Sequence, residues 1–237
     1  MRFVIALAIS LALVWLCAKP LKRYPVPFYI GAITLVGLYF WGVEANVHNE
    51  LWSYFQPLMQ RCALAFLLFS IVMFVGVLGE KSRLRTHLMP IRRQLSILAC
   101  IFAVGHVVFY GSSYIARLST AFTANLAFSL TLAVVITVLM AILGVTSFQV
   151  VKHRMSASTW KGIQRLAYAF YLLIYAHLAL LLAPSALAGN DVAVLSIVVY
   201  TVVVGAYVIL RTRKAIADRS ANASDTPSRD DLEAAAA

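Results

Sequence analysis

The sequence predicts an all-α, integral-membrane helix bundle of about seven transmembrane helices, and two observations support this. Of its 237 residues, 62% are hydrophobic and only 12% are charged, whereas a soluble domain has roughly 45–50% apolar and about 25% charged residues. The apolar residues also form runs of about 20, the length that an α-helix needs to cross a bilayer core of about 30 Å. Together these observations exclude a soluble globular protein.

The long apolar runs mark the expected transmembrane helices in order along the chain. Their expected ranges are 3–18, 26–43, 58–79, 93–111, 122–146, 163–183 and 191–210. The first run is expected to be a retained anchor rather than a cleaved signal peptide, because its basic cluster follows the apolar stretch instead of preceding it. Residues 216–237 are polar and then alanine-rich, so we expect a disordered tail after a transmembrane domain of residues 1–215.

The basic residues predict how the chain is oriented in the membrane. All Lys and Arg residues except Arg2, Arg61 and Arg117 fall in four alternate segments between or after the spans. These segments are 19–25, 80–93, 147–165 and the residues after 210. By the positive-inside rule they are cytoplasmic, so the N-terminus is expected outside and the C-terminus inside. The net charge of +11 is thereby explained by the membrane lipid surface, and no nucleic-acid partner is expected.

The three cysteines argue against disulfide exchange and against a covalently attached haem. Cys17, Cys62 and Cys100 lie in three different apolar runs and form no Cys-x-x-Cys pair. A c-type haem needs a Cys-x-x-Cys-His sequence, which the chain lacks. Any haem must therefore be held non-covalently.

Two of the five histidines fall within predicted spans, and they are the candidate ligands of a metal. His106 lies 14 residues beyond Arg92, and His177 lies 12 beyond Arg165 and 16 beyond Lys161. Both spans run from the inside to the outside, which places the two imidazoles at similar depths, about 18–24 Å from the inner basic residues. Two imidazoles on neighbouring helices can bind one haem iron from opposite faces. The sequence therefore predicts a bis-histidine b-type haem site.

Other interpretations of the histidines remain open. His106 and His177 can instead hydrogen-bond neighbouring helices of a non-redox transporter or scaffold, although ionisable groups at membrane depth are usually functional. His48, His87 and His153 fall in loops and are expected to be solvated. A Soret band on the purified protein separates the cytochrome from the transporter or scaffold.

Several motifs around these histidines resemble the ferric-reductase-like transmembrane superfamily. The run Arg92-Arg93-Gln94-Leu95-Ser96 opens a span, and His106 follows Arg93 by thirteen residues. The run Trp160-Lys161-Gly162-Ile163-Gln164-Arg165-Leu166-Ala167-Tyr168 precedes His177, which follows Gln164 by thirteen. Within the superfamily, the chain is most similar to the haem-binding membrane subunits of bacterial periplasmic methionine-sulfoxide reductases. The resemblance covers about residues 58–210.

The resemblance implies a b-type cytochrome of the bacterial cytoplasmic membrane, with a six-helix core and an additional N-terminal helix. It also implies electron transfer to an extracytoplasmic redox partner. Relatives with two haems carry a second pair of histidines where this chain has Arg93 and Gln164, so one haem b is expected. A quinol or a flavin reductase is the expected donor, and bound FMN or quinone is a further possibility. Direct reduction of ferric iron or of an external flavin is the alternative redox function.

Two arginines, one loop and one glycine are further candidates for a role at or near the site. Arg61 lies in a segment, Gln60-Arg61-Cys62-Ala63-Leu64, that resembles the family's Gly-Arg-x-Ala-Leu stretch, and its guanidinium can pair with haem propionates or with lipid headgroups. Arg117 is a second propionate candidate. The loop 44–57 is expected to be an interfacial turn, or else to dock a periplasmic partner or cap the haem edge. Gly105 can permit close helix packing or leave space for the porphyrin plane.

Overall fold

The computed structural model describes the backbone of residues 2–117 and 124–224. Within these ranges the side chains of residues 2–9, 13, 113, 115–117, 124 and 221–224 are not described. The described residues form helices and no strand, in the order α1 (Arg2–Arg23), α2 (Pro25–Glu44), α3 (Glu50–Gln60), α4 (Ala63–Val77), α5 (Arg83–Leu88), a 3₁₀ turn (Met89–Ile91), α6 (Arg92–Arg117), α7 (Ala124–Ser147), α8 (Gln149–Lys152), α9 (Ala157–Gln164), α10 (Leu166–Leu187) and α11 (Asp191–Ser224). The predicted all-α class is confirmed.

Five helical segments of the described chain are long and apolar enough to cross a membrane. They are α2, α5 with α6, α7, α9 with α10, and α11. The bent pair α3 and α4 makes a sixth if it is counted as one span. The first predicted span, 3–18, lies in α1, where many side chains fall outside the described residues. The chain is therefore a multi-pass membrane protein.

The predicted single span 58–79 is broken in the structure, which is a correction. Helix α3 ends at Gln60, and α4 begins at Ala63 with its axis turned by 55°. Between them Cys62 has a φ of +53°, in the left-handed region that ends a right-handed helix. The loop predicted at 44–57 is helical from Glu50, because the Asn49 side chain accepts a hydrogen bond from the Trp52 N–H at 2.7 Å and caps α3.

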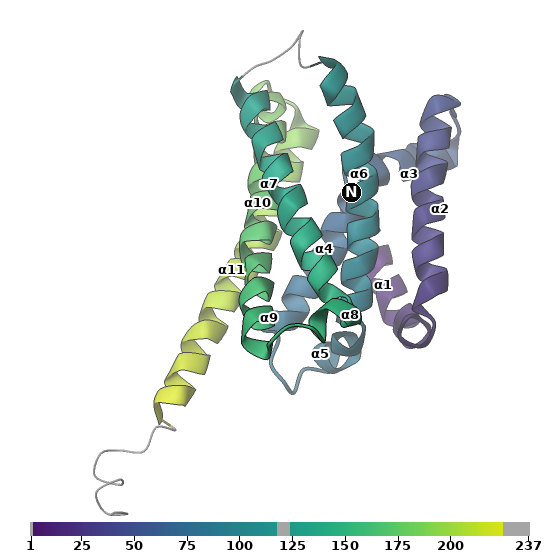
Figure 1. Cartoon of the computed structure of the whole chain (residues 1–237). Coiled ribbons are helices and arrows are strands. Elements are labelled where there is room, and N and C mark those ends of the chain that lie inside the picture. The colour runs from purple at the N-terminus through teal and green to yellow at the C-terminus, as the bar shows by residue number, and fades with distance from the viewer. Residues whose placement is uncertain (1, 118–123, 225–237) are drawn as a thin grey trace, which may run out of the picture.

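The four basic segments lie at one end of the bundle, which we call the basic end (Figure 1). The turn between α1 and α2 and the short helices α5, α8 and α9 lie there, and the C-terminal half of α11 extends beyond this end. The segments predicted as loops thus contain short helices. Helix α11 continues to Ser224, so residues 216–224 of the predicted disordered tail are helical, and the residues from 225 lie outside those described. Three alanines and Arg219, which are good helix formers, lie in this segment, and neither Gly nor Pro interrupts it.

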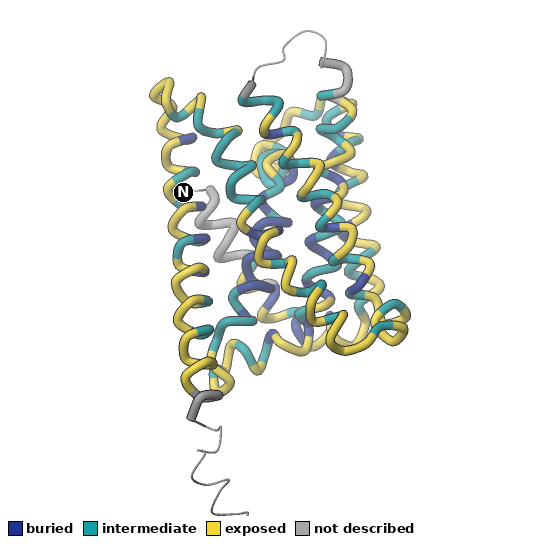
Figure 2. The backbone as a smooth tube through the Cα atoms, turned by 60° about the vertical axis from the view of Figure 1, so that its left-hand side comes forward, coloured by how far each residue is buried: buried dark blue, intermediate teal, exposed yellow. Residues whose placement is uncertain are grey.

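Helix α4 lies at the centre of the bundle, and its side chains are buried on every face. It packs on α6 and α11, while α10 packs on α7 and α11. Figure 2 shows the buried segments gathered in the middle and exposed residues along the outer helices. The exposed residues of those helices include large apolar ones such as Trp41 and Phe128. An apolar exterior around a packed interior suits a protein surrounded by lipid.

A proline inside α10 leaves one backbone carbonyl without a donor, and a side chain of a neighbouring helix supplies it. Pro184 has no N–H, so the carbonyl of Leu180, one turn earlier, lacks its usual helical donor. The Asn125 side chain on α7 donates to that carbonyl at 2.9 Å. This hydrogen bond joins α7 to α10 near the end of the bundle opposite the basic end, because both residues lie far from α8 and α9 along their helices.

Candidate functional site

The structure brings the two predicted ligand histidines together. His106 on α6 and His177 on α10 are both half-buried, and their imidazoles are close enough to interact electrostatically. Both helices begin at the basic end and run in the same direction, as the sequence predicted (Figure 1). Among the helices described, α6 and α10 do not pack extensively on each other, since α6 packs on α4 and α2 and α10 on α7 and α11.

A hydrogen bond to α7 fixes the ring of His177. Its Nδ1 donates to the backbone carbonyl of Ser129 at 2.9 Å and lies 3.1 Å from the Ser129 hydroxyl oxygen. Because a carbonyl oxygen only accepts hydrogen bonds, Nδ1 must carry the proton. In the neutral ring the lone pair is therefore on Nε2, the usual arrangement of a histidine that binds a metal.

The surroundings of His106 are different. Its Nδ1 is buried and has no hydrogen-bond partner in the part of the chain that the structure describes. The backbone carbonyl of Gln60, at the end of α3, interacts with the ring. The Tyr110 ring lies one turn further along α6, with the ring centroids 4.7 Å apart and the planes inclined by 48°. The break between α3 and α4 thus places polar groups next to His106.

Gly105 serves helix packing. A Cβ atom at this position would lie 2.6 Å from the Val36 Cγ1 of α2, closer than two carbon atoms normally approach. Gly105 therefore permits the close packing of α2 on α6, one of the two roles expected of it.

Of the two arginines predicted to pair with propionates, the structure describes the side chain of Arg61 alone. Arg61 lies just after α3 and is exposed, and it interacts electrostatically with Tyr110 and Tyr200. It is thus linked to the histidine pair through Tyr110. The side chain of Arg117 lies outside the described residues.

The positions that replace a second histidine pair do not form a ligand pair. Gln164 donates a hydrogen bond from Nε2 to the Thr146 hydroxyl at 3.2 Å. Arg93 is exposed. Between these positions and the histidines, the bundle interior is filled by packed apolar side chains that include Leu95, Leu98 and Phe170. Phe170 also meets Phe69 edge to face at 4.9 Å.

Sequence reasoning missed two residues of the site. Ser129 is almost fully buried, with 1% of its surface exposed, and a polar residue in an apolar span was a signal that it has a partner. Gln60 contacts His106 through its backbone carbonyl and Tyr110 through its side chain, and the sequence offers no signal for either contact. In the described residues no group of three His, Cys, Asp or Glu side chains converges to hold a bare metal ion. An iron at this site must therefore bring most of its own ligands.

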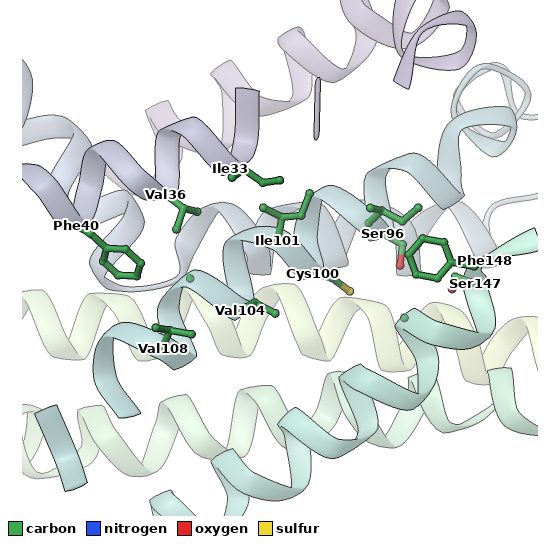
Figure 3. A pocket seen from close by; sticks show the side chains of 13 residues that line it. Ile33, Val36, Phe40, Ser96, Cys100, Ile101, Val104, Val108, Ser147 and Phe148 are labelled. Carbon is green, nitrogen blue, oxygen red and sulfur yellow. The ribbon is translucent and has the colours of Figure 1, made fainter. Parts of the chain in front are cut away.

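A cavity of about 390 Å³ lies beside the site but does not contain it. Figure 3 shows side chains from α2, α6 and the end of α7 pointing into it. Its lining is apolar apart from Ser96, Ser147 and the Cys100 thiol, and it includes Gly105 but neither histidine. The cavity thus lies outside the histidine pair.

Comparison with known proteins supports the resemblance seen in the sequence. Residues 61–175 match the family model described as ferric reductase like transmembrane component. The matched region includes α4, α6 and α7 with His106, and it ends just before His177. The match suggests a membrane electron-transfer component.

A relative from Treponema pallidum (strain Nichols), described as an uncharacterized protein, is 37% identical over 218 residues. The alignment covers 87% of this chain and 59% of the relative. The chain thus spans less than two thirds of that protein's length.

Proposed function

We propose that the protein is a b-type cytochrome subunit in which His106 and His177 bind one haem b from opposite faces. The observation that carries this proposal is the hydrogen bond from His177 Nδ1 to the Ser129 carbonyl, which leaves Nε2 as the free lone pair. The neighbouring His106 interacts with His177 electrostatically. Both rings come from helices that pack on other helices instead of on each other.

The residues around the histidines fit a haem. A haem supplies reversible one-electron chemistry when bound. Ser129 would hold the His177 ring in one tautomer and orientation, and the Gln60 carbonyl would support the His106 ring. Arg61, at the same end of the bundle, would pair with the anionic propionates through its guanidinium.

One haem fits the chain better than two. Gln164 is already hydrogen-bonded to Thr146, and an amide is a poor axial ligand. Side chains such as Leu95, Leu98 and Phe170 occupy the interior between the histidines and the basic end. A second haem would have to displace this packed core.

The direction of electron flow follows from the placement of the basic segments. If the basic end faces the cytoplasm, as the positive-inside rule requires, the histidines lie toward the outer face of a bacterial cytoplasmic membrane. The acceptor is then an extracytoplasmic reductase, in the class of periplasmic methionine-sulfoxide reductases that the motifs resemble. A quinol or a flavin reductase supplies the electrons, with FMN or quinone as a bound intermediate carrier.

The test is the haem content of the purified protein and its variants, measured as pyridine haemochrome absorbance per chain. We expect about one haem per wild-type chain and less than about a tenth of that in His106→Ala or His177→Ala, since each variant removes an axial ligand. Gln164→Ala and the loop variant His153→Ala serve as controls and keep the haem. Full haem occupancy in both histidine variants would refute the ligand assignment, and no haem in the wild type would favour a transporter or scaffold.

A further inference from the structure

A cluster of arginines and tyrosines lies at the basic end, remote from the histidines. We define the arginine cluster as Arg85 on α5, Arg92 on α6, Tyr168 on α10, and Tyr207 and Arg211 on α11. Arg92 interacts electrostatically with Arg85, Tyr168 and Tyr207. Tyr207 interacts in turn with Arg211. Four helices thus bring three positive charges and two phenol groups together.

Arg92 is the most enclosed of the three guanidinium groups. It is half-buried at the first residue of α6, and its Nε donates to the backbone carbonyl of Val72 on α4 at 3.1 Å. A Cβ atom at Gly76 would lie 3.6 Å from its Nη2, so that glycine leaves room for the side chain. The hydrogen bond to Val72 uses the Nε donor and leaves the Nη groups for other acceptors.

The cluster contains little negative charge to balance these arginines. In the described residues the ion pair at this site joins Arg85 Nη2 to Glu80 at 3.7 Å. The Glu80 side chain is 86% exposed, and an ion pair that exposed contributes little. Arg85 also donates to the Leu78 carbonyl at 2.8 Å, which fixes its position. Like charges are thus held near one another in a partly desolvated place, where they repel.

Arg211 is oriented by an aromatic ring. Its guanidinium lies 4.7 Å from the centroid of the Tyr168 ring, a cation–π arrangement that leaves the edge of the guanidinium available to acceptors. Tyr207 lies beside it with 3% of its surface exposed.

We propose that the arginine cluster binds a phosphate group, presented either by an anionic phospholipid or by a soluble phosphate compound. Two or more guanidinium groups match phosphate oxygens with paired hydrogen bonds, and the bound anion relieves the repulsion between Arg85 and Arg92. The cluster lies where α6 and α11 reach the basic end, at the level at which lipid phosphates surround a membrane protein. The site is independent of the histidine pair.

The experiment measures binding to the detergent-purified full chain by native mass spectrometry and by thermal melting. The probes are phosphatidylglycerol, phosphatidylcholine and inorganic phosphate. Arg92→Gln and Arg211→Gln are compared with Arg83→Gln and Arg213→Gln, which remove the same charge from exposed positions of α5 and α11. We expect the cluster variants to bind about tenfold to a hundredfold more weakly, because each loses charge-assisted hydrogen bonds, and the controls to bind as wild type does.

The probes separate the two sources of phosphate. Binding of phosphatidylglycerol but not of inorganic phosphate assigns the site to lipid, and competition by inorganic phosphate assigns it to a soluble compound. Equal binding of phosphatidylcholine and phosphatidylglycerol without any response to inorganic phosphate, or an equal loss in the controls, overturns the proposal. If Arg92→Gln does not fold, the phosphate binding of Arg211→Gln is the deciding measurement. Haem content measured in parallel separates failure here from failure of the cytochrome assignment.

Discussion

Substitution of Gly105 by alanine is expected to destabilise the bundle, and the contact distances give the magnitude. The new Cβ would lie 2.6 Å from Val36 Cγ1, 3.0 Å from Cγ2 and 3.4 Å from Cβ. Non-bonded carbons prefer about 3.5–4.0 Å, so α2 would have to move away from α6 by roughly 1 Å. Rotation of Val36 gives little relief, because a β-branched side chain is stiff and both methyl groups face the glycine. Overpacking of this kind costs about 1–3 kcal/mol.

The assay is unfolding of the purified protein in mixed micelles with increasing dodecyl sulfate, followed by far-ultraviolet circular dichroism. Gly111→Ala is the matched control on the same helix, since nothing lies within 4 Å of its new Cβ. It should be neutral, or stabilising by up to about 1 kcal/mol from helix propensity. In a Val36→Ala background, most of the cost of Gly105→Ala should disappear. Equal stability of the Gly105→Ala and Gly111→Ala proteins would refute the reasoning.

Two further substitution pairs test hydrogen bonds inside the bundle in the same unfolding assay. Asn125→Ala should cost about 1–3 kcal/mol, because it leaves the half-buried Leu180 carbonyl of α10 without its donor. Pro184→Ala in the same chain should restore stability by supplying a backbone N–H, and no rescue would contradict this role of Asn125. Tyr171→Phe should destabilise the protein less than Ser70→Ala does. In Tyr171→Phe the Ser70 hydroxyl still donates to its backbone carbonyl, whereas in Ser70→Ala the fully buried Tyr171 hydroxyl loses its partner. The reverse order would show that Tyr171 has another partner.

The fold class and the histidine pair were accessible from the sequence because both depend on distances along single helices. An apolar run of about 20 residues specifies a span regardless of its neighbours. The spacing of His106 from Arg92 and of His177 from Arg165 sets depth along two helices that run in the same direction. Packing against other helices was not needed for either inference.

The features that the sequence did not predict depend on contacts between distant segments. The break after α3 requires Cys62 to adopt a left-handed conformation, which a non-glycine residue rarely does and which no motif marks. Trp52 packs into the space beside Gly42, so the course of α3 depends on α2. The contact of Ser129 with His177 depends on how α7 is rotated about its axis. Hydropathy along one helix carries no information on such contacts.

The supports of the two histidines suit the proposed haem site. Each ring is oriented by an element other than the opposing histidine helix: His177 by the Ser129 carbonyl of α7, and His106 by the end of α3 near Gln60. If His106 and His177 were held by a hydrogen bond to each other, a ligand would have to break it before binding. Because the Ser129 carbonyl binds Nδ1 of His177, α7 orients that ring and leaves its Nε2 unused. The broken span is thus part of the site, since a continuous helix would have used the Gln60 carbonyl for its own hydrogen bonding.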